Sequence, residues 1–299
     1  MVLFLHNRYR STGGEERAVE DLLWLVREHL GERAELFSRD SASLSRAGAA
    51  AGLLRGGLAP EEIARAVRMA GARVVHAHNL QPALGWRALA AARAAGARVV
   101  LHLHQYRLVC AICVCFTRGA ECTRCHGRDT LPGVRLNCRG SAGEALAYGV
   151  SLALWQRRLV EQADAVIVPS LFARERLREL GAPLPWERVH IMPPPLRDAS
   201  FAAGGRASGE AGRAGADAPQ DDYALVVARL AAEKGVDVAI DACRIAGIAL
   251  VIAGDGPERA ALARRAADGG GEVRFVGRVD DARLASLRAG AAIALAPSR

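Results

Sequence analysis

The sequence of 299 residues is poor in aromatic side chains, which make up 5%, and it lacks several patterns that define a protein class directly. No run of 18 or more apolar residues occurs, so we expect no membrane-spanning helix. The apolar start Val2–Leu5 is too short for a secretory signal, which predicts a cytoplasmic protein with reduced cysteines. No block of Lys and Arg with interleaved aromatics is present, which argues against a nucleic-acid partner.

What is there fits a globular protein of ordinary two-domain size. Hydrophobic residues make up 51% and charged residues 24%, a balance that allows a sizeable core. The formal charge of +8 favours an anionic partner, such as a nucleotide. It also permits peripheral contact with the inner face of an anionic cell membrane, although no basic amphipathic helix supports such contact. Nothing in the sequence indicates an oligomeric state.

Short apolar runs alternate with amphipathic stretches along most of the chain. We expect strands at 2–7, 34–38, 73–79, 97–104, 165–169 and 187–192. Helices are expected between them, except that 43–58 fits no pattern. After a Gly- and Ala-rich stretch, strands follow at 223–228, 249–253, 273–276 and 291–296. This alternation predicts an α/β fold with two doubly wound parallel sheets. The domains would be 1–198 and 223–299, joined by a flexible linker at 199–222.

Three predicted strands end in a histidine followed by an amide, namely His6-Asn7, His78-Asn79 and His104-Gln105. Since ligands bind at the carboxyl ends of parallel strands, we expect these side chains to form one rim. His76 and His102 each precede a rim histidine by two residues and so share its strand face. A metal site made of these histidines is an alternative, but no carboxylate lies near them in sequence.

Two loops have features of phosphate binding. Gly13 and Gly14 stand between the first strand and a helix, as in doubly wound nucleotide-binding proteins, although two glycines also fit a simple tight turn. Arg229 and Lys234 follow the strand at 223–228, where the next helix begins. Two cations beside a helix N-terminus suit a diphosphate. The alternative is a loop whose basic residues are merely solvated.

Six of the seven cysteines fall in the insertion 105–141, which interrupts the alternation. Their spacing places two thiolate pairs within reach of one tetrahedral zinc, in the pattern Cys110-x2-Cys113-x8-Cys122-x2-Cys125. Cys138 and His126 are further ligand candidates. We expect a structural zinc, because a loop this polar cannot form an apolar core of its own. A redox-inert cysteine-rich loop and an iron–sulfur cluster are the alternatives.

Seven motifs, in order, resemble those of the retaining GT-B glycosyltransferases of family 4. They are Gly13-Gly14-Glu15-Glu16, the stretch from His102 to Cys110, Val168-Pro169-Ser170, Arg229-Leu230-x3-Lys234-Gly235, Ala253-Gly254-Asp255-Gly256-Pro257, Val273-x-Phe275-Val276-Gly277 and Ala296-Pro297-Ser298. The resemblance implies two Rossmann-like domains, of which the second binds a nucleotide-sugar donor. The first would bind most of a carbohydrate or lipid-linked acceptor, as in cell-envelope polysaccharide synthesis. Catalysis would require no metal.

The resemblance also implies roles for particular residues. Arg229 and Lys234 would hold the donor diphosphate and neutralise charge on the leaving group. Backbone groups of Gly13, Gly14 and Gly254 would approach the donor, and Arg278 would lie beside its base. His104 would contact the donor sugar near the reacting carbon as the catalytic residue. The acceptor-side rim would be His6, His78 and Asn79.

The sequence departs from the family pattern at three places. His104-Gln105 stands where relatives have His-Asp, and Pro193-Pro194-Pro195 where they have Pro-Asn-Gly. The Glu-x7-Glu motif expected after Pro297-Ser298 is missing, so we expect a C-terminally truncated chain with little or no activity.

Some relatives have a similar cysteine-rich insertion. The positions most like theirs are Cys110, Cys122, Cys125 and Cys138, which we take as the zinc ligands. Other functions remain as alternatives: a non-catalytic metal-binding scaffold, or a sugar-nucleotide epimerase on the same architecture.

Overall fold

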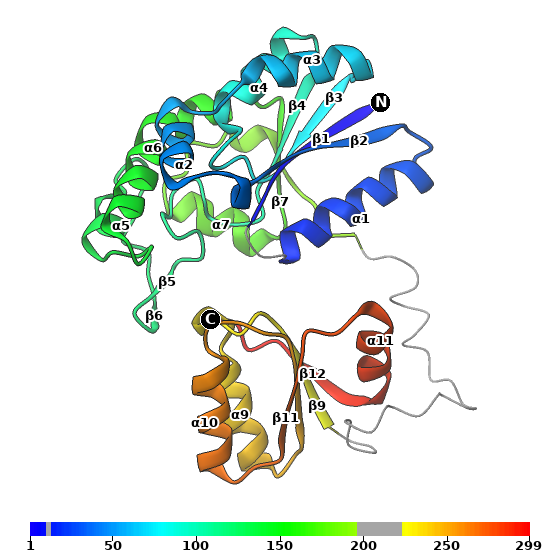
Figure 1. Ribbon diagram of the computed structural model, residues 1–299, viewed down its shortest axis with the longest axis vertical. Coiled ribbons are helices and arrows are strands. Elements are labelled where there is room, and N and C mark those ends of the chain that lie inside the picture. Colours follow the sequence, from blue (N-terminus) through cyan, green and yellow to red (C-terminus); the bar gives the residue numbers. More distant parts are fainter. Residues whose placement is uncertain (10–12, 196–222) are drawn as a thin grey trace. The chain divides into compact units, whose positions relative to one another are not determined.

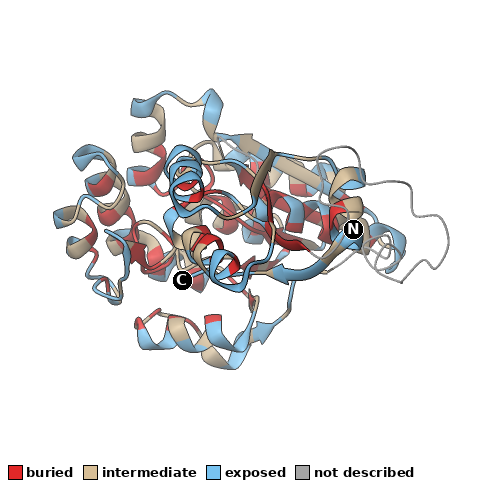
Figure 2. Ribbon diagram, turned by 90° about the horizontal axis from the view of Figure 1, so that it is seen from below, coloured by how far each residue is buried: buried red, intermediate tan, exposed pale blue. Residues whose placement is uncertain are grey.

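The computed structural model describes residues 1–9, 13–195 and 223–299 of the chain. Contacts divide it into two compact units, Met1–Pro195 and Leu196–Arg299, which Figure 1 shows in sequence colours. Each hydrophobic cluster among the described residues draws its members from one unit only. Figure 2 shows that the buried residues concentrate along the strands and the inward sides of the helices. The predicted linker 199–222 lies outside the described residues.

The first unit contains a six-stranded sheet of order β2-β1-β3-β4-β7-β8, in which every neighbouring pair is parallel. Its strands are β1 (Val2–Arg8), β2 (Ala34–Asp40), β3 (Val74–Ala77), β4 (Arg98–His102), β7 (Ala165–Val168) and β8 (Val189–Ile191). The parallel α/β prediction is therefore confirmed. The strand order reverses between β1 and β3, and ligands of such sheets bind outside the carboxyl ends of the strands at this point.

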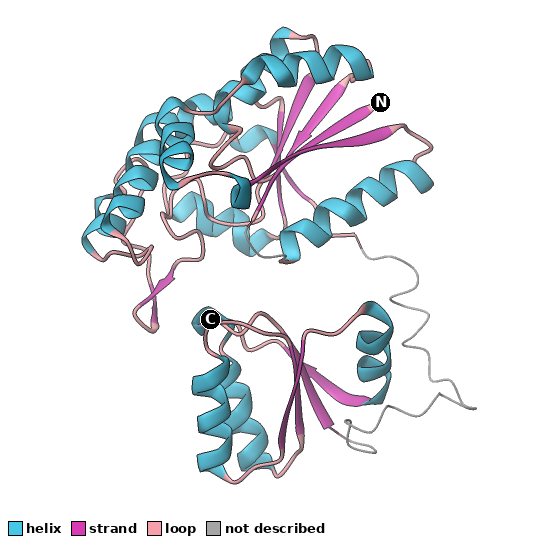
Figure 3. Ribbon diagram, in the orientation of Figure 1, coloured by secondary structure: helices cyan, strands magenta, loops and turns pink. Residues whose placement is uncertain are grey.

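Helices cover both faces of this sheet (Figure 3). They are α1 (Gly14–Glu28), α2 (Arg46–Arg55), α3 (Pro60–Ala70), α4 (Gly85–Ala94), α6 (Ala142–Glu161) and α7 (Leu171–Glu179), with 3-10 turns η1 (Ser41–Ser43) and η2 (Trp186–Arg188). Alternation along β1 decides which face each side chain meets. Phe4 packs with Val19 and Leu22 of α1, whereas Leu3 and Leu5 join a cluster with Ile63 of α3.

Helix α2 lies within the stretch that fitted no sequence pattern, and its contacts explain why. Ser45 caps it by accepting a hydrogen bond from the Gly48 N–H at 3.0 Å. A Cβ added at Gly52 would lie 2.5 Å from the carbonyl oxygen of Pro82. The small residues of α2 therefore serve close packing between segments, which weakens any hydrophobic periodicity.

The cysteine-rich insertion contains a short hairpin, β5 (Phe116–Thr117) and β6 (Ala120–Glu121), and a short helix, α5 (Leu131–Arg135). The loop was expected to form no apolar core of its own, and its buried apolar residues join the core of the first unit. Leu108, Val109, Cys110 and Cys115 are buried in the main cluster of the first unit. The insertion is thus anchored by burial against the core of the first unit.

The second unit contains a four-stranded parallel sheet of order β11-β10-β9-β12. Its elements are β9 (Tyr223–Val227), η3 (Ala232–Lys234), α9 (Val236–Ala246), β10 (Leu250–Ala253), α10 (Arg259–Gly269), β11 (Val273–Gly277), α11 (Asp281–Gly290) and β12 (Ala291–Leu295). Val226 packs with Ile240 of α9 on one face, and Leu225 with Leu287 of α11 on the other. In the described part of the chain, no helix has the length and apolar character needed to cross a membrane.

Candidate functional site

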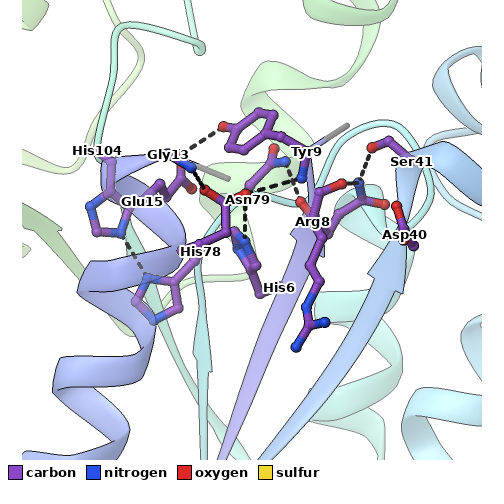
Figure 4. Close-up of polar contacts among 12 residues, drawn as sticks. His6, Arg8, Tyr9, Gly13, Glu15, Asp40, Ser41, His78, Asn79 and His104 are labelled. Carbon is purple, nitrogen blue, oxygen red and sulfur yellow. Dashed lines mark hydrogen bonds and ion pairs between the residues drawn. The ribbon is translucent and has the colours of Figure 1, made fainter. Parts of the chain in front are cut away.

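Four histidines from β3, β4 and the residues just after them form a stack in the first unit. The rings of His76 and His102 have centroids 5.4 Å apart, those of His102 and His104 4.2 Å, and those of His78 and His104 5.1 Å, with interplanar angles of 13° to 20°. His78 Nδ1 and His104 Nε2 share a hydrogen bond of 2.8 Å (Figure 4). Two of the three predicted strand-end histidines, His78 and His104, are therefore in contact, and the ring of His6 lies 6.4 Å from that of His78.

Three histidines of the stack have ring nitrogens close enough together to hold a metal ion. Ring nitrogens of His76, His78 and His102 lie within 4.8 Å of one another. His76 Nε2 and His102 Nδ1 lie 3.3 Å apart and share a hydrogen bond, so these two nitrogens already have a partner. Burial lowers the pKa of His76 to about 4 and that of His102 to about 2, which keeps both imidazoles neutral near pH 7.

The corner between β1 and α1 is organised by Glu16. Its carboxylate accepts hydrogen bonds from the backbone N–H of Tyr9 at 3.1 Å and of Gly13 at 2.8 Å, and it lies 3.6 Å from His6 Nε2. Burial alone would raise the pKa of Glu16, but the hydrogen bonds outweigh it and hold the pKa at about 2. Gly13 precedes α1 and Gly14 begins it, and a Cβ at Gly14 would meet no atom within 4 Å. The backbone at Gly14 is therefore open to a ligand.

The predicted acceptor-side rim is brought together but buried. His6 is 1% exposed, His78 3% and Asn79 4%. The Asn79 side chain donates to the carbonyl of Asn7 at 2.6 Å and accepts from the Gln81 N–H at 3.2 Å, so it joins the ends of β1 and β3. Asn79 thus fixes the strand ends internally.

The open edge instead displays a network that sequence reasoning missed. Glu15 accepts from the Tyr9 hydroxyl at 2.6 Å and from Gln105 Nε2 at 3.0 Å, and Arg107 donates to the Tyr9 hydroxyl at 2.8 Å. Burial lowers the pKa of His104, and the negative charge of Glu15 acts against that shift. Residue 105 is Gln, where the family pattern has Asp. The carboxylate at this corner belongs to Glu15, which accepts a hydrogen bond from Gln105. The available signal was that Gln105 and Arg107 directly follow a histidine-ended strand.

A cavity opens beside this network, wholly within the first unit. Its empty space is about 700 Å³, a figure that includes open solvent at its mouth. Glu15, His104, Gln105 and Arg107 line one part of it, and apolar side chains from α2, α4 and α6 line much of the remainder. His104 therefore combines a neutral buried stack on one side with a solvent-connected space on the other.

A second, smaller cavity collects cysteines of the insertion: Cys110, Cys115, Cys122, Cys125 and Cys138. The four positions identified by family resemblance are all among them. Cys113, which the spacing alone selected, does not line this cavity and is buried near Arg107, while His126 packs against Gly181. Cys113 has a left-handed backbone conformation, with φ 77°.

Backbone groups favour a thiolate in this cavity. The sulfur of Cys110 interacts with the Cys115 thiol and with backbone N–H groups of Ile112, Cys113 and Cys115, which lower its pKa to about 6. The sulfur of Cys125 accepts backbone hydrogen bonds from Ala111 and Gly133, although burial raises its pKa. Among the described residues, only the histidine group has three ligand atoms within 4.8 Å of one another, so no three of the sulfurs lie that close together.

In the second unit, Arg229 and Lys234 occupy the loop after β9. Arg229 forms an ion pair with Glu233, whereas no ion pair to Lys234 exists among the described residues. Gly235 has φ +60°, and a Cβ there would lie 2.1 Å from the carbonyl oxygen of Pro297. The loop is thus held against the end of β12, with Lys234 half-buried and uncompensated.

Composition adds a signal that the sequence reasoning overlooked. Lys234 is the only lysine in the chain, so 39 of the 40 cationic Lys and Arg residues are arginine (40 − 1). An ammonium group is a compact point charge with three rotatable donors, unlike the planar guanidinium. A position that keeps lysine in such an arginine-rich chain is a candidate for specific anion contact.

Gly254 and Arg278 lie at the same edge of the second sheet. Gly254 follows β10 with φ +144°, and a Cβ there would lie 1.9 Å from the carbonyl oxygen of Ala228. Its N–H donates to the Gly277 carbonyl at 2.7 Å, and Arg278 comes next, exposed. The carboxyl edge of this sheet therefore carries Arg229, Lys234 and Arg278. The loops between them pack closely, backbone against backbone, at Gly235 and Gly254.

The two parallel sheets, each with polar groups at its carboxyl edge, define a protein of the two-domain, Rossmann-like α/β class. The chain matches the glycosyl transferase 4-like domain over residues 9–195 and the glycosyl transferases group 1 family over residues 212–299. It belongs to this family of glycosyltransferases. No curated protein matches it.

Solved structures with a similar fold are distant in sequence. A glycosyltransferase from Rickettsia africae has 13% identity and a TM-score of 0.61, with 99% of this chain and 72% of that chain covered. WaaG, a glycosyltransferase involved in lipopolysaccharide biosynthesis, has 17% identity and a TM-score of 0.57, with 100% and 75% covered. A UDP-GlcNAc 2-epimerase from Neisseria meningitidis has 9% identity and a TM-score of 0.52, with 98% and 76% covered. The fold is GT-B.

Proposed function

We propose that this protein transfers a sugar, with retention, from a nucleotide-sugar donor to a carbohydrate or lipid-linked acceptor of the cell envelope. Family membership supports the nucleotide-sugar donor. The observation that carries the donor site is the β9 loop, where Lys234 stands without an ion-pair partner among the described residues beside Arg229 and the start of α9. Cations and helix N–H groups at one strand end suit a diphosphate.

Transfer would then depend on the charged and polar side chains at the carboxyl edges of the two sheets. Arg229 and Lys234 would neutralise the diphosphate as it leaves. Gly13, Gly14 and Gly254 would allow backbone to approach the donor, and Arg278 would lie beside its base. On the acceptor side, His78, His102 and His104 all line the cavity, and His104 is the half-buried one while the other two are buried. We assign His104 to the reacting sugar and propose that no metal takes part in the transfer.

The chain allows a direct test of the donor site because it contains only two amines, the N-terminus and Lys234. Reductive methylation with carbon-13 formaldehyde therefore gives two resolved groups of signals and keeps both charges. We expect UDP-, GDP- or ADP-sugar to shift the Lys234 signal and leave that of Met1, whose amine pairs with Glu32 at 2.9 Å. If no member of the donor panel shifts it, the donor site is elsewhere.

Variants sharpen the same test. We expect Lys234→Ala to weaken donor binding by about tenfold or more, the effect of losing roughly 1.4 kcal/mol. Arg264→Ala changes an exposed cation on α10 and serves as the matched control. Acceptor-dependent release of nucleoside diphosphate would identify a transferase, whereas conversion of the donor without acceptor would identify an epimerase.

We also propose that the cysteine-lined cavity holds a structural zinc, with Cys110, Cys122, Cys125 and Cys138 as ligands. The support is that all four line one cavity and that backbone N–H groups surround two of the sulfurs. Zinc binds thiolates in tetrahedral sites and couples binding to folding. The ion would tie the hairpin β5–β6 and α5 to the main core.

Metal analysis tests the zinc site. We expect one zinc per chain in the purified protein, loss of zinc in Cys122→Ser, and retention in Cys113→Ser, whose thiol lies outside the cavity. Removal of zinc should lower thermal stability and leave donor affinity unchanged. Equal zinc content in the two variants would show that the ligands are assigned wrongly.

A further inference from the structure

The cavity beside His104 has both apolar and polar lining residues. The apolar ones include Leu53 on α2, Leu80 and Pro82 after β3, and Leu152 and Trp155 on α6. The polar ones include Glu15 on α1 and His104, Gln105 and Arg107 after β4. A ligand that suits this lining must have both polar and apolar groups.

The cavity is not a packing gap that a small shift could close. A Cβ at Gly52 would lie 2.5 Å from the Pro82 carbonyl oxygen, and one at Gly56 would lie 2.2 Å from Trp86 Nε1. The walls therefore already touch on one side. Trp155 Nε1 donates to the Leu53 carbonyl at 3.1 Å and so fixes α6 to α2. Contact this close on fixed backbone keeps the adjoining space open.

An aromatic pair strengthens the wall. The rings of Trp86 and Trp155 lie 5.9 Å apart, and the Arg158 guanidinium lies 5.3 Å from each ring. Such contacts hold both indoles in place beside the cavity.

Three residues that line this cavity carry buried polar atoms without a hydrogen-bond partner among the described residues. They are His78 Nε2, Gln81 Oε1 and Trp86 Nε1. These three atoms have almost no accessible surface, so a ligand in the cavity does not reach them. The polar side chains that a ligand can reach are Glu15, Gln105 and Arg107, which are half-buried. The carboxylate accepts, the guanidinium donates and the amide does both, so a hydroxyl group suits all three. A purely hydrocarbon ligand would satisfy none.

We propose that this cavity binds the acceptor of the transfer, and that the acceptor is a hydroxyl-bearing glycoside of an apolar alcohol, such as a lipid or an aromatic aglycone. The apolar group lies between α2, α4 and α6, and the hydroxyl-bearing head lies beside His104. This inference rests on the proposed glycosyl transfer, and it excludes a free saccharide as the best acceptor.

Binding of three simple glucosides to the full chain tests the proposal. Isothermal titration with methyl, phenyl and octyl β-glucoside compares the same head group with no, aromatic and aliphatic apolar parts. We expect phenyl or octyl glucoside to bind at least tenfold more tightly than methyl glucoside. The better of the two distinguishes an aromatic from a lipid source. Equal affinities, or no binding by any of the three, would overturn the proposal.

A filled cavity provides the second arm. Ser151 is buried and lines the cavity, so Ser151→Phe places a ring inside it. Leu154, on the same helix, is 46% exposed and does not line the cavity, so Leu154→Phe is the matched control. We expect Ser151→Phe to reduce affinity for the tighter glucoside at least tenfold and Leu154→Phe to leave it unchanged. If Ser151→Phe does not fold, Ser151→Leu makes the same test with a smaller side chain. Unchanged affinity in the filled variant contradicts the assignment.

Donor binding, measured separately by the Lys234 signal, keeps the two proposals distinct. Glucoside binding without donor binding would refute the transferase proposal while the ligand class of the cavity holds. Donor binding without any preference among the glucosides would refute only the acceptor inference.

Discussion

Glu16 shows how much a single side chain contributes to this fold. It is 8% exposed, yet it remains ionised because the Tyr9 and Gly13 N–H groups point at it. Its folded-state pKa of about 2 lies below the usual 4.5, so the folded state holds the charged form more strongly than the unfolded chain does. This stabilisation is fully present above about pH 4.5 and is lost as the pH falls towards 2.

We therefore expect Glu16→Gln to lower the free energy of unfolding by roughly 1–3 kcal/mol at pH 7, and by progressively less below pH 4.5. Urea unfolding at several pH values measures this difference. Glu20→Gln, an exposed change on the same helix, is the control and should have little effect at any pH. A Glu16→Gln deficit that stays constant down to pH 2 would contradict the linkage.

At the scale of elements, the histidine stack joins β3 to β4 and makes their contact sensitive to acid. Burial lowers the pKa of His76, His78, His102 and His104. The unfolded chain binds protons near pH 6.5, while the folded stack stays neutral until a lower pH. The stability from this stack is thus present above about pH 6.5 and is lost as the pH falls through the folded-state values.

We expect His76→Phe, which keeps a ring against Phe4, to make stability less dependent on pH. Between pH 6.5 and about 4, the slope of the unfolding free energy should decrease by about 1.4 kcal/mol per pH unit, one proton's worth. His190→Gln changes an exposed histidine on β8 and should leave the slope as it is. Parallel curves for wild type and His76→Phe would rule out the neutral stack.

The contact between α2 and the loop after β3 is a second feature of this scale. A Cβ at Gly52 would meet backbone 2.5 Å away, so something must shift. We expect Gly52→Ala to destabilise the first unit by about 1–3 kcal/mol through overpacking. Gly143 in α6 has no atom within 4 Å of its Cβ position, and Gly143→Ala should stabilise slightly, by about 0.5 kcal/mol. Thermal unfolding of both variants checks the opposite signs.

For the whole molecule, the separate cores predict separate unfolding. Leu101 belongs to the main cluster of the first unit, and Leu225 to a cluster of the second. Each is 1% exposed, and truncation to alanine should cost about 2–5 kcal/mol. We expect calorimetry to resolve two transitions, with Leu101→Ala lowering one and Leu225→Ala the other. A single transition that both variants lower equally would show that the units unfold together.

Periodicity along the chain predicted most elements because each strand and helix needs one apolar face or stripe of its own. Ser170 caps α7, and its hydroxyl accepts from the Ala173 N–H at 3.1 Å. Asp280 likewise caps α11 by accepting from the Arg283 N–H. Helix α2 was missed because its small residues serve a contact with Pro82 and not a hydrophobic stripe. The sequence therefore predicted the elements that are stabilised by contacts between near neighbours in the chain.

The sequence by itself determined the alternation of strands and helices, the histidines at strand ends and the cations after β9, since each depends on neighbours along the chain. Only the tertiary structure decided how deeply each side chain is buried and which distant residues it contacts. It buried His6 and His78, left Cys113 out of the cysteine cavity, and joined Glu15 to Gln105 across 90 residues. Periodicity gives the face on which a side chain lies. How far that face is covered, and by which distant segment, depends on packing that no local pattern contains.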